Sequence, residues 1–581
     1  MRKDSEDIKN SREKYILWML IIIAVVIRLL SLNNMLHGDD SIVAGFAENK
    51  EYLGGTINVH PPLATIFLIA TTTIFGINNW SLKLPTFIFA IATIFLVYYF
   101  CKAEYDVKTG LWASFFLTFL AWHVYGSATN IGGEGLLAFF LVLASYTFLK
   151  YTKENTWKGN LITGVFFCLA FFIKETAVLL LGVFVLYLIL NKFPLRTTGV
   201  KLVIIVLVLS LGIVTLVLID YHWNDSQFVK NVARDFVKRS VERTGYTEAT
   251  PIYYLFSIFK ISFWMSPLFL FSIFWFFEKE KELSWKDNLI TKVQDYCFIY
   301  VILFGGFFIF YINPVFDKAR YLLTIAPFLS IFAGRVIAKY TFTKRQYLLL
   351  VLWTIFCMMA LMKINMERNS ISFDQREEIF QKIKSLSMNF DVGIVSETGS
   401  AGFVINIRTF LIAQLFALFL GACYLYWKNN MNVAQFFLLL FLGVCLAYNF
   451  VVIGELQMHI TGPDYEKATE VINNFALENK LPEPIYLVKD ASLMYYLKDN
   501  YTSFMNVDTI QNSHERVEEI RNKMKDNGGS VLMVDIPLMN KKGELWQLLM
   551  QCTNLFSFSD KKVIIGYIFD CSNLRQQETG N

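Results

Sequence analysis

The sequence predicts a polytopic α-helical membrane protein with about thirteen spans, followed by a C-terminal α/β domain outside the cytoplasm. Two observations support this fold class. Of the 581 residues 55% are hydrophobic and only 17% are charged, whereas soluble proteins carry about 25% charged residues. Apolar runs also recur from residue 15 to residue 454. Modest Gly, Pro and Cys contents exclude collagen-like, disordered and disulfide-scaffold classes.

The first expected span covers residues 15–32 and follows a terminus rich in Lys and Arg. No cleavage signal of a secreted protein is evident, so we expect a retained helix with its N-terminus in the cytoplasm. The other expected spans are 80–100, 111–125, 135–150, 161–174, 176–190, 202–219, 252–277, 297–311, 321–338, 347–362, 411–427 and 433–452.

One more apolar run, residues 62–77, is short and begins with two prolines. If this run crossed the membrane, every later basic loop would change sides. The positive-inside rule therefore favours an interfacial or re-entrant helix on the outer face. Large segments then lie outside, beginning with a first outer loop at residues 33–79, so we expect the chemistry to take place on that face.

Charge divides the chain near Gly454. Basic residues are in excess over residues 1–454, whereas acidic residues are in excess over residues 455–581, which are polar enough to fold in water. We expect a transmembrane domain and a soluble domain with this boundary, and the net charge of +5 is too small to indicate a nucleic-acid partner.

The tail alternates between predicted strands and helices, which indicates a small α/β fold. No glycine-rich phosphate loop opens a helix there, so we expect binding or capping rather than catalysis. The expected strands are 484–488, 530–535 and 563–569, and the expected helices are 464–479, 491–498 and 514–525.

Cysteines fall into two groups. Six of the eight lie in or beside apolar helices, where they pack as small hydrophobic residues. Cys552 and Cys571 lie in the outer tail, where an oxidising compartment allows them to pair. The sequence leaves their pairing open.

The first outer loop holds the first candidate site residues. Asp39 and Asp40 follow the first span, and adjacent carboxylates act as a general base or hold a cation. His60 precedes Pro61-Pro62, which fix the entry to the interfacial helix, and its imidazole suits a phosphate or a metal. The alternatives are a solvated loop start and a structural histidine.

Four further candidates lie at outer ends of expected helices. Glu134 follows two glycines, and the alternative role of its carboxylate is to complement the helix dipole. Lys174 interrupts two apolar runs, and Arg320 with Tyr321 begins another span. Cations there suit an anionic ligand, with snorkelling as the alternative.

The outer segment 221–251 is basic, and Arg234 and Lys238 share a helical face by their spacing. This basic segment could bind an anionic acceptor or lipid headgroups. A solvated amphipathic helix is the alternative.

Several motifs together resemble the GT-C glycosyltransferases that use polyprenyl-phosphate sugars, in particular the protein O-mannosyltransferase and lipid A aminoarabinose transferase families. Asp39-Asp40 sits where these families have Asp-Glu, and residues 59–63 look like the mannosyltransferase His-Pro-Pro-Leu motif. Residues 80–85 are similar to Trp-x-x-Arg-Leu-Pro, and those from Arg320 to Arg-Tyr-Leu-Leu. Residues 134–140 are similar to a family stretch that begins with the second acidic residue, usually Asp.

Three differences from the family motifs lie at positions expected to contact the donor phosphate. Asp40 replaces the usual Glu, residues 127–133 lack an Arg often found there, and Lys174-Glu175 replaces Lys-Gly-Pro.

The resemblance implies an inverting sugar transfer with Asp39 as base, Asp40 as its orienting partner and Glu134 binding the acceptor, a sugar hydroxyl or a metal. It further implies donor-phosphate contacts from His60, Lys174, Arg320 and Tyr321. Whether His60 and Glu134 hold a divalent metal stays open. The class of acceptor, which is a protein, a lipid or a cell-envelope glycan at the plasma membrane, also stays open.

Two other function classes compete with this one. A transporter or flippase predicts functional charges near mid-membrane and internal repeats, and neither is clear here. A non-catalytic receptor leaves the charges of the first outer loop unexplained.

Overall fold

The computed structural model forms two compact units. The helical unit comprises Met1–Asn34, Phe46–Asn365 and Thr409–Met458, and the second unit comprises Met35–Gly45, Met366–Arg408 and His459–Asn581. The structure describes residues 2–30, 32, 62–129, 133–154, 156–224, 230, 270–278, 284–310, 322–362, 370–372, 391–395, 401–458, 474, 485–488, 506–507, 522, 530–534, 550–560 and 563–570.

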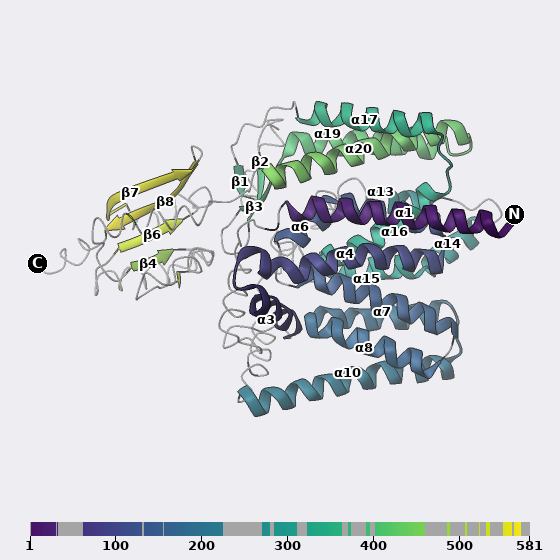
Figure 1. Cartoon of the computed structure of the whole chain (residues 1–581), viewed down its shortest axis with the longest axis horizontal. Helices are drawn as coiled ribbons and strands as arrows, with labels where there is room; N and C mark the ends of the chain where they lie inside the picture. Colours follow the sequence, from purple (N-terminus) through teal and green to yellow (C-terminus); the bar gives the residue numbers. More distant parts are fainter. Residues whose placement is uncertain are drawn as a thin grey trace, which may run out of the picture. The chain divides into compact units, whose positions relative to one another are not determined.

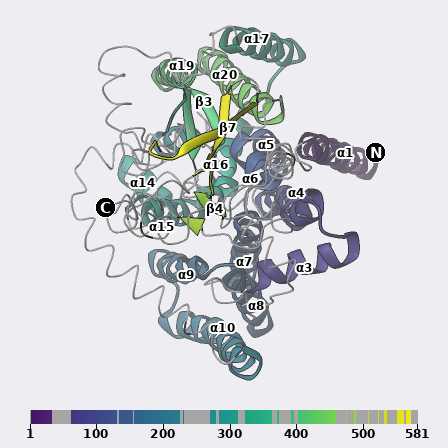
Figure 2. The ribbon, with the colours of Figure 1, turned by 90° about the vertical axis from the view of Figure 1, so that its left-hand side faces the viewer.

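The helical unit is a bundle in which the expected apolar runs form helices (Figure 1). Helices α17, α19 and α20 lie along one edge of the bundle and α10 along the opposite edge (Figures 1 and 2). Its helices are α1 Arg2–Leu29, α3 Leu63–Phe75, α4 Asn79–Glu104, α5 Val107–Phe119, α6 Ala121–Thr129, α7 Glu134–Glu154, α8 Trp157–Ile173, η1 Glu175–Val178, α9 Leu179–Leu190, α10 Leu195–Asn224, α13 Leu270–Phe277, α14 Trp285–Val293, α15 Tyr296–Phe310, α16 Ala326–Ala338, α17 Lys344–Met362, α19 Ile407–Tyr426 and α20 Met431–Met458.

Within the described residues, five helices are long and apolar enough to cross a membrane, or six if α14 and α15 count as one span bent by 66°. The total of thirteen stays a prediction. The run at 62–77 contains α3, whose 13 residues fall short of the roughly 20 that a spanning helix needs. Its interfacial placement also stays a prediction.

The expected single span at 111–125 is wrong in one respect. Helix α5 ends at Phe119, Leu120 is extended (φ −71°, ψ 111°), and α6 begins at Ala121. No Gly or Pro marks this position, so the run has no local breaking signal. Side chains from α1 and α20 bond to the backbone on either side of the break.

Helices α5 and α16 approach with their backbones nearly in contact. A Cβ added at Gly334 of α16 would lie 2.7 Å from the Thr109 carbonyl oxygen and 2.9 Å from the Ala113 nitrogen of α5. Small residues permit such close helix packing in membranes, where van der Waals contact drives association.

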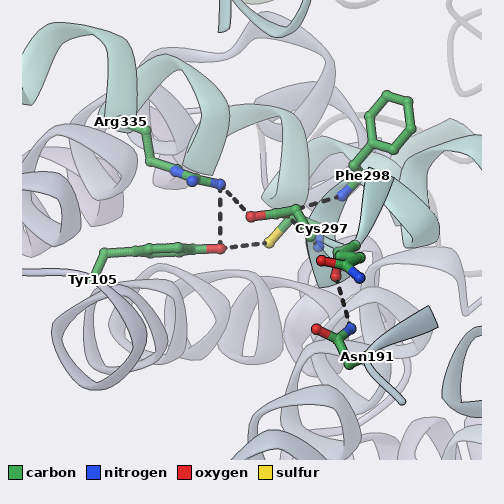
Figure 3. A network of polar contacts seen from close by, with 7 residues as sticks. Tyr105, Asn191, Cys297, Phe298 and Arg335 are labelled. Atoms are coloured by element: carbon green, nitrogen blue, oxygen red, sulfur yellow. Dashed lines mark hydrogen bonds and ion pairs between the residues drawn. The ribbon is translucent and has the colours of Figure 1, made fainter. Parts of the chain in front are cut away.

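A polar network fixes the corner between α14 and α15, at the end of the bundle that holds the chain's N-terminus (Figures 1 and 3). Asp295 caps α15 by accepting hydrogen bonds from two backbone N–H groups, and its other oxygen lies 2.6 Å from Arg335 of α16. Gln294 donates to the Leu190 carbonyl (2.7 Å) at the end of α9. Burial raises the pKa of the nearby Tyr105 phenol, so this hydroxyl stays neutral.

The second unit contains two β-sheets. Strands β1 Ser370–Ser372, β2 Asp391–Val395 and β3 Ala401–Asn406 form one sheet, with β1–β2 parallel and β2–β3 antiparallel. The other sheet has the order β5-β4-β6-β8-β7 and mixes parallel pairs around β4 with antiparallel pairs around β8. Its strands are β4 Ile485–Val488, β5 Asn506–Val507, β6 Ser530–Val534, β7 Thr553–Asp560 and β8 Val563–Asp570.

The three strands expected in the tail are confirmed as β4, β6 and β8. Five strands were not expected, namely β5, β7 and the three strands between 370 and 406. The expected helices 464–479, 491–498 and 514–525 lie almost wholly outside the described residues, and the domain boundary near Gly454 stays a prediction. Cys552 is disulfide-bonded. Cys571, whose pairing with Cys552 the sequence left open, lies outside the described residues.

We predict that Gly334→Ala destabilises the protein by about 1–3 kcal/mol, because the new methyl group meets backbone atoms of α5 that cannot rotate away. The measurement is thermal unfolding in detergent. The matched control is Gly306→Ala in α15, where an added Cβ meets nothing within 4 Å. Equal melting temperatures for the two variants would contradict the close crossing.

Candidate active site

Three segments that carry expected site residues meet at Gly133. This glycine has φ +97°, a backbone conformation that other residues rarely adopt. An added Cβ would lie 3.3 Å both from Ala64 in the first turn of α3 and from Ile173 at the end of α8. The start of α7, the helix entered through His60-Pro61-Pro62, and the junction after α8 are therefore in contact.

Glu134 and Lys174 form a buried ion pair at this meeting point. Glu134 Oε1 lies 2.7 Å from Lys174 Nζ, and their side chains are 1% and 3% exposed. Glu134 is the first residue of α7, and Lys174 is the extended residue after α8. A carboxylate at a helix N-terminus and an ammonium group at a helix C-terminus are each favoured by the helix dipole.

The burial of this pair decides what it can do. Full burial of both side chains excludes snorkelling of Lys174 to water, which was the alternative reading. The Glu134 carboxylate holds the Lys174 ammonium group at hydrogen-bonding distance, and each charge compensates the other in the buried site. The pair suits the orientation of a fixed positive charge.

Helix α4 contributes a second buried ammonium group at its start. Lys83 and Thr86 are both fully buried on α4. Thr86 packs against α7, because a Cβ at Gly135 would lie 2.6 Å from the Thr86 methyl carbon. Lys83 lies one turn before Thr86. Lys83 lies within the motif at residues 80–85, but the sequence assigned it no functional role. A lone lysine at the start of an apolar run is the signal that could have identified it.

Seven expected site residues lie outside the described residues, so their roles stay predictions. The structure describes neighbours of two of them. Ala64, which contacts Gly133, lies four residues after His60. Leu323, which contacts Gly126 of α6, lies three residues after Arg320. The seven are Asp39, Asp40, His60, Arg234, Lys238, Arg320 and Tyr321.

Among the residues that the structure describes, no three His, Cys, Asp or Glu side chains gather closely enough to hold a metal ion. A site shared by His60 and Glu134 is not tested by this finding, because His60 is not among them.

Comparison with known proteins shows what this chain resembles. Residues 59–219, which include α3, Glu134 and Lys174, match the sequence model of the family described as dolichyl-phosphate-mannose-protein mannosyltransferase. No curated protein sequence matches the chain.

Solved structures match over nearly the whole chain. ArnT from Cupriavidus metallidurans in the apo state aligns with TM-score 0.54 at 12% identity, over 96% of this chain and 98% of that one. ArnT bound to undecaprenyl phosphate gives TM-score 0.54 at 13% identity, over 95% and 97%. AglB from Archaeoglobus fulgidus, in complex with an inhibitory peptide and a dolichol-phosphate, gives 0.47 at 11% identity, over 96% and 74%. The chain is therefore a polytopic helical membrane protein with the GT-C fold.

Proposed function

We propose that the protein is a membrane glycosyltransferase that moves a sugar from a polyprenyl-phosphate donor to an acceptor on the outer face, with inversion. The observation that carries this proposal is the buried Glu134–Lys174 pair beside the start of α3, within the segment that resembles the mannosyltransferase family. The similar ArnT fold, solved with undecaprenyl phosphate, supports a lipid-phosphate donor. The proposal places the protein in the plasma membrane, with a cytoplasmic N-terminus and residues 455–581 outside.

In the proposed reaction, an acceptor hydroxyl attacks the anomeric carbon from the face opposite the phosphate. The new C–O bond forms as the bond to the phosphate oxygen breaks, and the lipid phosphate leaves with the electron pair. Asp39 takes the hydroxyl proton, and Asp40 orients Asp39. Because the phosphate is already a good leaving group, no nucleotide is required.

Positive charge must meet the negative charge that develops on the leaving phosphate. We assign this role to Lys174, His60 and Arg320, with Tyr321 as a hydrogen-bond donor. Glu134 then acts on Lys174 by holding the ammonium group in place. This role differs from the binding of the acceptor, a sugar hydroxyl or a metal that the sequence suggested for Glu134.

A divalent cation held by His60 and Glu134 would be a second source of positive charge at the leaving phosphate. Transfer that persists in EDTA would assign the charge to the side chains. Loss of transfer that Mg²⁺ or Mn²⁺ restores would assign it to a metal.

Protein, lipid and cell-envelope glycan acceptors all present the required hydroxyl, and Arg234 and Lys238 suit an anionic acceptor or lipid headgroups. A flippase would need charges along a path through the bundle. The buried Glu134, Lys174 and Lys83 instead lie near helix ends, which favours transfer chemistry at a membrane surface.

We predict that Asp39→Asn lowers transfer by about 10²–10⁴-fold, the usual contribution of a general base. Transfer is measured in membranes with mannosyl-phosphoundecaprenol as donor, normalised to the amount of folded protein. Asp40→Asn, in the same loop, loses less because Asp40 only orients the base. Wild-type rates for Asp39→Asn would remove Asp39 as the base.

We predict that Glu134→Gln destabilises the protein by about 3–5 kcal/mol, because Lys174 keeps its charge in a buried site without its partner. The double variant Glu134→Leu/Lys174→Met replaces both charges with apolar groups of similar size and regains most of the melting temperature. We expect no transfer in the double variant, because Lys174 no longer supplies positive charge to the leaving phosphate. Recovery of both stability and transfer would show that the ion pair is only structural.

A further inference from the structure

The break between α5 and α6 exposes backbone groups in an apolar interior. One extended residue, Leu120, separates the two helices, so the last carbonyls of α5 and the first N–H groups of α6 lack partners within their own helices. Unpaired backbone groups are costly inside a membrane protein. Side chains from two helices far away in the sequence bond to three of these groups.

Arg28 of α1 reaches the carbonyl side of the break. Its guanidinium donates to the carbonyl oxygens of Leu117 and Thr118, both at 3.4 Å, and to that of Ala24 in its own helix at 3.1 Å. The other contact is with His123 of α6, whose Nδ1 lies 2.8 Å from Arg28 Nη2. Because arginine only donates, His123 Nδ1 accepts this hydrogen bond and the ring proton lies on Nε2.

Asn449 of α20 reaches the amide side of the break. Its Oδ1 accepts a hydrogen bond from the Ala121 N–H at 2.9 Å, and its Nδ2 donates to the Cys445 carbonyl at 2.8 Å. Arg28 and Asn449 are both fully buried, and His123 is 1% exposed. The break is thus bound to α1 and to α20.

An unbroken apolar helix would need none of these polar residues. Burial of a guanidinium without a carboxylate is expensive, and intramembrane charges usually mark function. Among the described residues, no acceptor lies within hydrogen-bonding distance of Arg28 Nε, so even this arrangement leaves one donor unsatisfied. The break is therefore maintained at a cost in stability.

Helix α6 lies between the segments that carry the proposed site. The side chain of Leu323 packs against Gly126 of α6. A Cβ added at Gly126 would lie 2.4 Å from the Cδ2 atom of Leu323, so this position has no room for a larger residue. Helix α6 ends at Thr129, shortly before Gly133 and Glu134. Helix α1 ends one residue after Arg28 and leads to Asp39. Figure 1 shows α6 beside the C-terminal end of α1.

We propose that Arg28, His123 and Asn449 are positioning residues that hold the broken helix α6 and thereby place Glu134 and the turn after Arg320 for the transfer step. This inference rests on the proposed function. It assigns no contact with substrate to the three residues. They act through the direction of α6, where a misplacement of about 1 Å at the reacting groups costs on the order of 10²-fold in rate.

The test compares conservative and apolar replacements in the full-length protein. His123→Leu and Asn449→Leu remove the acceptors. His123→Asn and Asn449→Asp keep an acceptor oxygen near the same place. We expect the leucine variants to lower kcat with mannosyl-phosphoundecaprenol by about 10–100-fold, to change KM less than kcat, and the conservative variants to regain most of that loss.

Gly334→Ala is the control for stability, because it perturbs the α5–α16 crossing without a contact to α6. We expect its kcat per folded molecule to stay near that of the wild type despite a lower melting temperature. If the leucine and conservative variants are equally active, or if kcat falls with melting temperature along the same line as for Gly334→Ala, the positioning role is wrong.

Hydrogen exchange separates this inference from the proposed function. In His123→Leu, the amides of α6 and of the first turn of α7 should exchange faster, while those of α10 stay unchanged. A wild-type protein that shows no sugar transfer overturns the proposed function, whereas the exchange result still decides the positioning role. Unchanged exchange in α6 overturns the positioning role alone.

Discussion

A carboxylate and an ammonium group each cost several kcal/mol to bury in an apolar interior, and Glu134 and Lys174 offset this cost only as a pair. Their contact at 2.7 Å requires that α7 begin and α8 end at the same place. Gly133 makes that possible because its backbone conformation and its missing side chain let α3 and α8 close around the start of α7. The requirement to keep these two charges together therefore fixes the relative positions of three helices.

A related constraint recurs at three interruptions among the described helices. Lys174 separates α8 from η1, Asp295 caps α15 at its corner with α14, and Leu120 separates α5 from α6. At each interruption a charged or amide side chain satisfies freed backbone groups or pairs with another charge. The corner at Asp295 relies on Arg335 and ties together α9, α15 and α16 (Figure 3). At these three interruptions, polar side chains meet the ends of helices.

The sequence predicted most of the described apolar helices because long apolar runs report burial directly. It also predicted that Glu134 and Lys174 lie at helix ends, since glycines and a charge pair interrupt the runs there. It missed the break at Leu120, because no Gly or Pro is present and the side chains that bond the backbone there, Arg28 and Asn449, belong to other helices. Arg28 was absorbed into an apolar run, and Asn449 is 328 positions from its partner Ala121. Strand β7 was missed because its Ser and Asn residues mask the apolar alternation.

The hydrogen bond between Asn449 and Ala121 has a consequence for biogenesis. During synthesis α5 and α6 enter the membrane long before α20 is made, so the amide side of their break lacks this partner until the last helix of the unit arrives. The packing around Leu120 can therefore be complete only after Asn449 of α20 has been made.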